Sequence, residues 1–418
     1  MKKILIVLLS LIIISSTFLA GCTNQGTGGG EKVIKVGVLT DLSGDLSTEG
    51  TQINNILKIA KDNVEQYFKE KGLNYKVELY VEDTQTNPSL CLQKLQNLKA
   101  QGCNLIIGPL SSSEVKNIKD YVNANKLVVI SPSSTADPHI LGFTKPEEKK
   151  YIFRMVPNDN FQARAIAGEI KDMGIKNVVV LYRDDAWGQG LESAAVNNMK
   201  KEGIKILAVI SYPSQPTPSD WSQYIQKLLD SVKGKDPKDT GILAIGFGEL
   251  ATLMSQIPDN SPLLNYKWFG SDGFAMNENI LKEAKAKGEK VGFYSTVFYG
   301  KSDEAKKVIE EYKKRGYGKE VGQYALCAYD AFMLGVISYA EMLEKEKKYD
   351  ADLLSKLIKE NAPKYSNGVF GFKPVTGYIV FNEWNDRASG DYGIYAITKD
   401  GWKLVGIWHY KTGKIEWL

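Results

Sequence analysis

The stretch VIKVGVLT at residues 33–40 has the length and the apolar, β-branched composition of a buried strand. A Ser/Gly-rich turn follows at residues 41–50, and apolar side chains then recur at helical spacing from Ile53 to Phe68. A strand, a polar break and a helix with one buried stripe together form the repeating unit of a parallel sheet covered by helices. This stretch and its surroundings therefore predict an α/β fold.

The same alternation continues along the chain. Each further strand-like segment has a helical stretch before or after it, which is typical of a doubly wound α/β protein. The other segments that we expect to form strands are residues 76–81, 105–108, 127–131, 177–182, 204–210, 242–247 and 266–270.

The N-terminus has the pattern of an export signal. Two lysines precede an apolar run at residues 4–18, and Ala20 and Gly21 are the small residues that a signal peptidase requires. Cys22 follows directly, which resembles the lipobox of prokaryotic lipoproteins, where this cysteine receives a lipid. The alternative is an uncleaved spanning helix, since residues 4–20 just reach the short edge of the ~17–25 residues that such a helix needs. Both interpretations place the remainder outside the cell.

Composition and length predict a folded body that follows a flexible linker. We expect residues 1–21 to be a signal peptide and residues 22–31 a flexible linker, because the latter are rich in Gly and Thr. Roughly 400 residues remain after cleavage, which favours two lobes over one. The formal net charge of +4 and the absence of basic runs interleaved with aromatic residues argue against a nucleic-acid partner. We expect no further membrane-spanning segment.

The remaining cysteines indicate packing rather than chemistry. Cys91 lies in a predicted helix that starts near Asn87-Pro88 and ends near Gly102, and Cys103 follows the end of that helix. Twelve helical residues would separate the two cysteines by ~18 Å, against the ~7 Å limit for a disulfide. Because Cys327 also lacks an obvious partner, we expect three buried free thiols.

The sequence offers little for catalysis. The two histidines, His139 and His409, do not have the spacing of metal ligands, and no phosphate-binding glycine loop occurs. Asp184 and Asp185 form an adjacent pair, which is more typical of a solvated loop or a helix start than of a catalytic dyad. We therefore expect a protein that is not an enzyme and that has no metal site and no cofactor.

Two strand ends carry runs of hydroxyl groups. Residues 108–113 (GPLSSS) and 131–135 (SPSST) both place serines where we expect a strand to give way to a helix. In open α/β sheets, ligands bind at the carboxyl ends of strands, where helix N-termini also offer free N–H groups. These hydroxyls are suited to an anion such as a carboxylate. The alternative is that Ser112, Ser133 and Thr135 cap their helices.

From about Val33 to the C-terminus the chain resembles the extracellular solute-binding proteins of the branched-chain amino acid ABC importers, which have the periplasmic binding protein type I fold. This resemblance implies two doubly wound, Rossmann-like lobes whose chain crosses the hinge near Pro157, Phe298 and Pro374. The lobes would comprise residues 32–157 plus 299–373, and 158–298 plus 374–418. The segments that carry the resemblance are residues 36–38 (VGV), 42–44 (LSG), 107–113 (IGPLSSS), 130–135 (ISPSST), 182–190 (YRDDAWGQG) and 269–273 (FGSDG).

The resemblance also implies how a bound amino acid would be held. Hydroxyls of the first lobe would surround its α-carboxylate, and Asp272 would hold its α-ammonium group, since an ammonium taken out of water needs a countercharge. Without the resemblance, Asp272 would be interpreted as a turn residue in Ser-Asp-Gly. The hydroxyl residues concerned are Ser112, Ser133, Ser134 and Thr135.

The predicted pocket departs from the family pattern at three positions. Trp187 and Phe247 stand where tyrosines are usual, so they form apolar lids, and ordinary packing is the alternative for both. Leu110 and Tyr324 match the apolar side-chain pocket, but Glu49 stands where an aromatic residue is expected. A carboxylate there would favour a polar or cationic ligand. However, a glutamate in a polar turn is usually exposed, which favours an outward-pointing Glu49.

The resemblance implies a monomeric receptor, tethered to the membrane only through a lipid on Cys22. It would capture a small amino acid, branched-chain or related, between its lobes and deliver it to ABC permease subunits. Three alternatives remain: a sensory lipoprotein of the same fold, a binder of an amide or urea-type solute, and a cell-surface hydrolase on an α/β scaffold.

Overall fold

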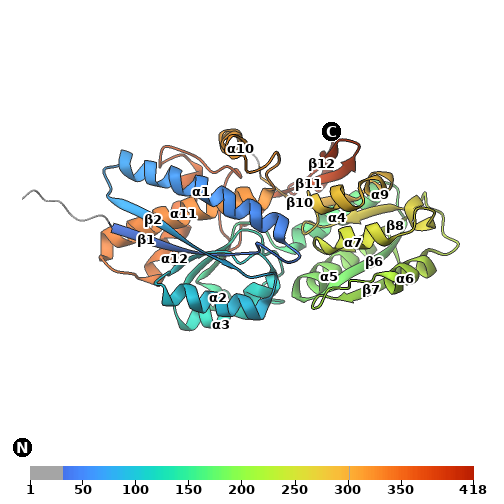
Figure 1. Ribbon diagram of the computed structural model, residues 1–418, viewed down its shortest axis with the longest axis horizontal. Helices are drawn as coiled ribbons and strands as arrows, with labels where there is room; N and C mark the ends of the chain where they lie inside the picture. Colours follow the sequence, from blue (N-terminus) through green and yellow to red (C-terminus); the bar gives the residue numbers. More distant parts are fainter. Residues whose placement is uncertain (1–31, 301) are drawn as a thin grey trace, which may run out of the picture.

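The computed structural model describes residues 32–300 and 302–418, so Cys22, the leader and the linker lie outside the described residues. Two α/β lobes lie side by side along the long axis of the molecule (Figure 1). The first lobe (residues 32–157 and 302–387) surrounds a five-stranded sheet, and the second lobe (residues 158–299 and 391–418) surrounds an eight-stranded sheet.

The sheet of the first lobe is entirely parallel. Helices α1, α11 and α12 cover one face and α2 and α3 cover the other (Figure 1). The strands, in spatial order, are β2 (Tyr75–Asp83), β1 (Lys32–Thr40), β3 (Leu105–Ile107), β4 (Val128–Ser131) and β5 (Ile152–Arg154). The helices are α1 (Ser47–Glu70), α2 (Pro88–Ala100), α3 (Ser112–Ala124), α10 (Glu304–Lys314), α11 (Gln323–Glu346) and α12 (Ala351–Ser366), with a 3₁₀ turn η1 at Pro146–Lys149.

The sheet of the second lobe is parallel at one end and antiparallel at the other. Its parallel strands are β7 (Lys205–Pro213), β6 (Asn177–Asp184), β8 (Thr240–Ile245), β9 (Lys267–Gly270) and β10 (Tyr294–Tyr299), followed by the antiparallel β11 (Asp391–Thr398), β12 (Gly401–His409) and β13 (Lys414–Trp417). The helices are α4 (Asp159–Asp172), α5 (Ala186–Lys201), α6 (Ser222–Val232), α7 (Glu249–Gln256), α8 (Glu278–Glu283) and α9 (Lys285–Val291), with a 3₁₀ turn η2 at Pro262–Asn265.

Two details differ from the sequence-based expectation. The short connections between β11, β12 and β13 permit only antiparallel pairing, so the second sheet is mixed rather than purely parallel. In addition, β4 ends at Ser131, and a long loop rather than a helix connects it to the 3₁₀ turn that begins at Pro146. The hydroxyl run at residues 131–135 therefore belongs to a loop.

The chain passes between the sheets three times. It leaves the first sheet after Arg154, returns after Tyr299 and crosses again before Asp391. The last crossing lies later than the expected position near Pro374, because residues after this proline still bind the first lobe. Val375 and Thr376 donate their N–H groups to Asp330 of α11.

A buried charge cluster fixes that late segment to the first lobe. Asp386 accepts hydrogen bonds from Lys149 Nζ at 2.8 Å and from two guanidinium nitrogens of Arg154, and all three side chains are fully buried. Burial alone would raise the pKa of Asp386, but the charges of Arg154 and Lys149 outweigh it and hold the pKa below its ordinary value. The cluster joins residues that lie more than 200 positions apart.

Packing confirms the expected state of the cysteines: Cys91, Cys103 and Cys327 are buried free thiols. Cys327 lies in α11, which is long and apolar enough to cross a membrane, in contrast to our expectation of no further candidate span. This helix is buried almost throughout and packs against α1, α12 and the first sheet. Its apolar character is thus explained by its central place in the first lobe.

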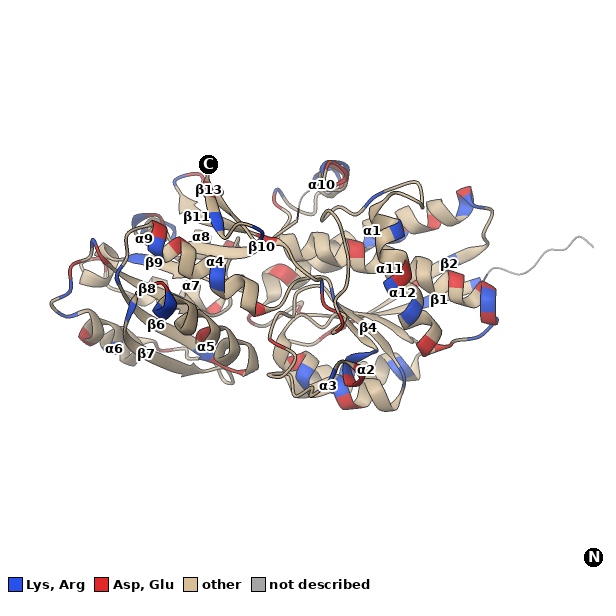
Figure 2. Ribbon diagram, turned by 180° about the vertical axis from the view of Figure 1, so that it is seen from behind, with Lys and Arg blue, Asp and Glu red and all other residues tan. Residues whose placement is uncertain are grey.

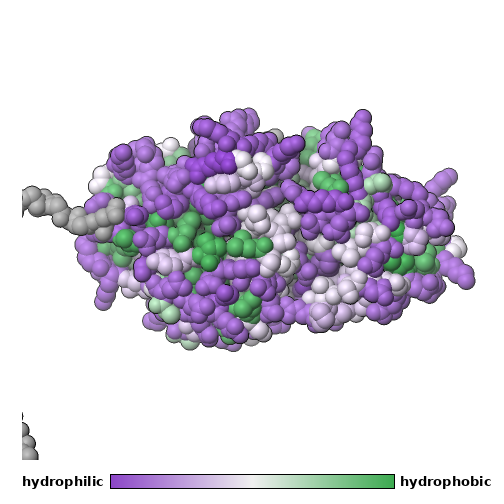
Figure 3. All heavy atoms as spheres, viewed as in Figure 1, coloured by the Kyte–Doolittle hydropathy of each residue, from purple (hydrophilic) through white to green (hydrophobic). Residues whose placement is uncertain are grey.

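The surface carries both signs of charge on the helices of both lobes (Figure 2). Hydrophilic side chains cover most of the face in Figure 3, with apolar side chains gathered mainly over the first lobe. The large apolar residues that are most exposed are Leu418, Val369, Tyr378 and Val209.

We predict that Asp386→Ala lowers the free energy of unfolding by about 3–5 kcal/mol, because it leaves two buried cations without their partner. The matched control is Glu360→Ala, which removes an exposed ion pair with Lys356 on α12 and should cost about 1 kcal/mol or less. Urea unfolding curves measure both. Equal, small losses would contradict a structural role for the cluster.

Candidate functional site

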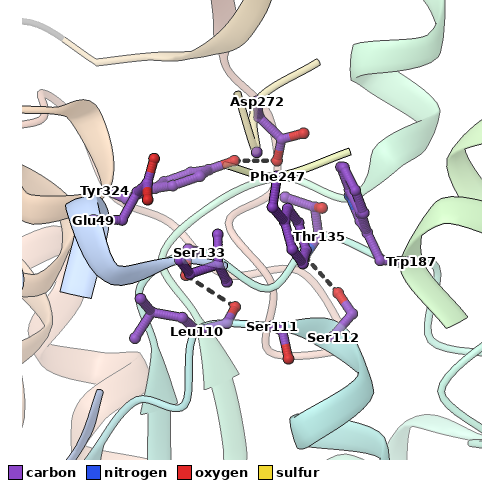
Figure 4. Close-up of a pocket in the computed structure, with 12 residues that line it drawn as sticks. Glu49, Leu110, Ser111, Ser112, Ser133, Thr135, Trp187, Phe247, Asp272 and Tyr324 are labelled. Atoms are coloured by element: carbon purple, nitrogen blue, oxygen red, sulfur yellow. Dashed lines mark hydrogen bonds between the residues drawn. The ribbon is translucent and has the colours of Figure 1, made fainter. Parts of the chain in front are cut away.

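A cavity lies between the two lobes, where the carboxyl ends of both sheets face each other (Figure 4). It encloses about 340 Å³ of space between atoms. All the residues that the sequence predicted for the ligand site line this cavity except Ser134. Its lining comprises Leu46, Glu49, Leu110, Ser111, Ser112, Ser133, Thr135 and Tyr324 from the first lobe and Trp187, Phe247, Asp272 and Gly273 from the second.

The strand ends are held close together by two glycines. Gly108 follows β3 with a φ of +102°, and a Cβ there would lie 1.9 Å from the carbonyl oxygen of Leu39 on β1. Gly50 in the first turn of α1 presses in the same way against Asp41, where a Cβ would lie 1.9 Å from the carbonyl oxygen. The first turn of α1 therefore sits on the end of β1 and faces the cleft.

The hydroxyl groups divide into structural and free ones. Ser111 caps α3 through a capping box with Glu114, so the expected capping role falls to a residue that we had not assigned. Ser112 Oγ accepts hydrogen bonds from the N–H groups of Thr135 and Ala136 at 3.2 and 3.1 Å, so its own proton is directed to Ser134 Oγ, 3.0 Å away. The capping box was visible in the sequence as Ser-x-x-Glu.

The loop after β4 supplies the second group of hydroxyls. Ser134 lies behind the cavity, with its Oγ 3.0 Å from Ser112 Oγ. Ser133 donates its proton to the carbonyl oxygen of Leu110 at 2.9 Å, so it can only accept from a ligand. Thr135 Oγ1 is buried without a well-formed hydrogen bond. Thr135 is thus the hydroxyl whose proton is available to an anion, and Ser112 can offer its proton only by turning away from Ser134.

Asp272 and Tyr324 meet across the two lobes (Figure 4). The Tyr324 hydroxyl, at the start of α11, donates to one carboxylate oxygen of Asp272, which follows β9. The other oxygen, Oδ1, is buried and makes no well-formed hydrogen bond, although Gln162 and the nearby backbone N–H groups also favour the charged form. Burial raises the pKa of Asp272 to about 6, although the hydrogen bond from Tyr324 opposes the shift. The carboxylate therefore retains an unused acceptor that faces a closed space.

A second buried acid lies beside this site and was missed from the sequence. Asp159, the first residue of α4, is buried, and its oxygens make no well-formed hydrogen bonds. Burial and the neighbouring Asp272 carboxylate raise its pKa well above the ordinary value, while the Thr135 hydroxyl opposes the shift. Only its place at an ordinary helix start was visible in the sequence, and that pattern carries no functional signal.

Trp187 and Phe247 stack on each other inside the cavity, with ring centroids 4.6 Å apart and planes inclined by 21°. Trp187 occupies the first turn of α5, whose N-cap is Asp185, in agreement with the expected helix start. The guanidinium of Arg183 lies 4.7 Å from the centre of the Phe247 ring. Both rings thus pack and line the cavity, so the alternatives that we considered for them are not exclusive.

Glu49 points into the cleft rather than to solvent, contrary to the interpretation that its polar turn favoured. Its Oε2 atom is buried and has no hydrogen-bond partner. Burial raises the pKa of Glu49 to about 8, and the carboxylates of Asp272, Glu249 and Glu278 add to the shift. The close contact of α1 with the end of β1 turns this side chain inward.

Polar contacts at the rim hold the lobes closed. Arg183 of the second lobe forms an ion pair with Asp45 of the first lobe at 2.8 Å, and it is also paired with Asp185 and Glu249 within its own lobe. The Gly248 N–H donates to the carbonyl oxygen of Asp45 at 3.1 Å. Gln215 Nε2 donates to the carbonyl oxygen of Thr86 at 3.0 Å.

A small cavity closed between two α/β lobes, with polar groups from the strand ends of both, defines the class of two-lobed solute-binding proteins. The profile of the family described as periplasmic binding protein matches residues 33–397. The chain belongs to this family, whose type I fold was expected from the sequence.

Individual relatives agree with this assignment. The chain is 58% identical to an uncharacterised protein of Methanocaldococcus jannaschii, over 97% of this chain and 98% of that one. It is 24% identical to the leucine-, isoleucine-, valine-, threonine- and alanine-binding protein of Pseudomonas aeruginosa, over 81% and 83% of the two chains. The structure of LivJ from Streptococcus pneumoniae in complex with isoleucine superposes with a TM-score of 0.73 at 19% identity, over 93% and 100% of the chains.

We predict that Glu49→Gln makes the ligand-free protein more stable than the wild type at pH 8 but not at pH 4. The ordinary pKa of this carboxyl is 4.5 and its folded value is about 8, so the folded state holds a proton that the unfolded state has lost between these values. Wild-type stability therefore falls relative to the variant as pH rises from 4.5 to 8 and is level outside this window.

Urea unfolding at a series of pH values measures this difference. Glu70→Gln, an exposed substitution near the end of the same helix, is the control and should show no such trend. A Glu49→Gln profile parallel to that of the wild type would place the Glu49 carboxylate in water.

Proposed function

We propose that this protein is an extracellular receptor that captures a small amino acid between its two lobes and delivers it to an ABC importer. The observation that carries the proposal is that one cavity contains both a hydrogen-bond acceptor and a hydrogen-bond donor that lack well-formed partners. Asp272 offers a buried acceptor oxygen and Thr135 offers a buried hydroxyl, each without a well-formed hydrogen bond. A zwitterion satisfies both, because its ammonium group donates and its carboxylate accepts.

The arrangement supports a stepwise assignment of roles. The α-carboxylate binds the hydroxyls of Ser112 and Thr135, and the α-ammonium group binds Asp272, while Tyr324 orients that carboxylate. Trp187 and Phe247 close over the ligand and exclude water. Ser133 accepts a hydrogen bond, and Ser134 keeps Ser112 in place. Leu110 and Glu49 lie on the side of the cavity away from Trp187, so they contact the ligand's side chain (Figure 4).

The receptor works by closing rather than by chemistry. The lobes, each on its own sheet, move about the three crossings, and a bound ligand shifts the population toward the closed form that a permease recognises. In this role the protein acts as a monomer, needs no cofactor and binds no nucleic acid.

The membrane tether belongs to the same proposal. Cys22 carries a lipid after the signal peptide is removed, and residues 23–31 connect it to β1. A chain of that length reaches only ~30 Å when extended. The binding lobes thus stay close to a permease in the same membrane, on its outer face.

We predict that one or more amino acids raise the melting temperature of the wild-type protein and that Asp272→Ala weakens their binding roughly 10- to 100-fold, because a hydrogen bond to a charged group is lost. The control is Asp259→Ala, an exposed carboxylate in the same lobe. Thermal-shift screening followed by calorimetry provides the affinities. Stabilisation by short-chain amides or urea alone would reject the zwitterion assignment.

A second prediction concerns the tether. Wild-type protein should be found in the membrane fraction, with an N-terminal fragment whose mass shows a lipid on Cys22, because a lipid-bearing chain partitions into the bilayer. Cys22→Ala should lack the lipid. Mass spectrometry of the N-terminal peptide measures this, and an unmodified peptide that begins at Met1 would favour the uncleaved spanning helix instead.

A further inference from the structure

A second cavity adjoins the first on the side of Glu49. It encloses about 360 Å³ of space between atoms and shares Glu49, Asp272 and Tyr324 with the first cavity, so these three side chains stand between the two spaces. Its other walls are mainly polar or small. They comprise Thr48, Gln52, Ala275, Met276, Val297, Gly322, Gln323 and Ala325.

The charges around these two cavities do not balance. The carboxyl groups of Glu49 and Asp272 face them, and no lysine or arginine is among the residues that line either one in the described part of the chain. Arg183 and Arg154 lie nearby, but they are paired with Asp45, Asp185, Glu249 and Asp386. An amino acid with an uncharged side chain supplies one positive charge, which Asp272 uses, and leaves Glu49 unpaired.

The position of Glu49 is suited to a positively charged partner. It lies in the first turn of α1, where the helix dipole favours an anion, yet its Oε2 atom has no donor. Asp159 does not enter this balance, because it does not line either cavity. In the empty site a proton takes the place of the missing cation on Glu49.

We infer that the ligand is a cationic amino acid and that Glu49 is the residue that selects it, by binding a side-chain ammonium or guanidinium group at the boundary of the second cavity. This inference rests on the proposed function, because it uses Asp272 and the hydroxyls for the α-groups. Gln52 and Gln323, at the far side of Glu49, offer further polar contacts to such a group.

The titration of Glu49 gives this recognition a pH signature. The charged groups that face Glu49 are the carboxylates of Asp272, Glu249 and Glu278, and Tyr324 from α11 is the neutral neighbour that can titrate. Burial raises the pKa of Glu49 to about 8, so at pH 7 a cation must displace its proton. Affinity for a cationic ligand therefore rises with pH up to about 8 and then levels off.

The experiment compares lysine, ornithine and arginine with norleucine, which has the carbon chain of lysine without the terminal amine, by calorimetry on the purified protein. We expect at least one of the three to bind ten-fold or more tightly than norleucine. Glu49→Gln should abolish this preference, whereas Glu70→Gln on the same helix should keep it. Binding of the cationic ligand at pH 7 in buffers of different ionisation enthalpy should release close to one proton.

Three results would overturn the inference while leaving the proposed function intact: norleucine or leucine binding as tightly as the cationic amino acids, a preference unchanged in Glu49→Gln, or no proton release. The measurements on the wild type do not depend on the folding of any variant. By contrast, if no amino acid bound, or if cadaverine, which lacks the carboxylate, bound as tightly as lysine, the proposed function itself would fail.

Discussion

The burial of carboxylates between two lobes is the constraint on which the rest of the site depends. Asp272 is buried and Glu49 is partly buried where the lobes meet, and the hydrogen bond from Tyr324 to Asp272 crosses that boundary. Desolvating a carboxylate is costly unless a donor or a countercharge replaces the lost water. The closed form is therefore favoured most when the cavity contains a group that supplies the missing partner. Ligand affinity and lobe closure are thus two aspects of one charge balance.

The protein uses buried charge in two opposite ways. In the first lobe, Asp386 is fully matched by Lys149 and Arg154, and the result is a rigid joint between distant parts of the chain. In the cleft, Asp272 and Glu49 each keep an oxygen without a well-formed hydrogen bond. The paired cluster stabilises the fold of the first lobe, while the carboxylates without well-formed hydrogen bonds indicate where a ligand binds.

Much of the fold could be predicted from the sequence, because β1, α1 and the following units repeat a strong local pattern of apolar spacing. The antiparallel strands at the C-terminus could not be predicted in this way. They continue the second sheet from β10, and they reach β10 only because the chain crosses back from the first lobe. Most of the site followed from strand ends and the family resemblance. The inward turn of Glu49 and the burial of Asp159 did not, because each depends on a tertiary contact: the packing of α1 on β1 for Glu49, and lobe closure for Asp159.

The pairing of Arg183 has a consequence for how quickly a bound solute can leave. Parting the lobes breaks its contact with Asp45, but Asp185 and Glu249 move with it and continue to neutralise it. Asp45 is already 22% exposed and needs only to become fully hydrated. Neither charge is stranded in an apolar environment during opening, so this ion pair adds little to the activation barrier. The residence time of the solute is then governed by the backbone contacts of Asp45 and Thr86 across the rim and by the contacts inside the cavity.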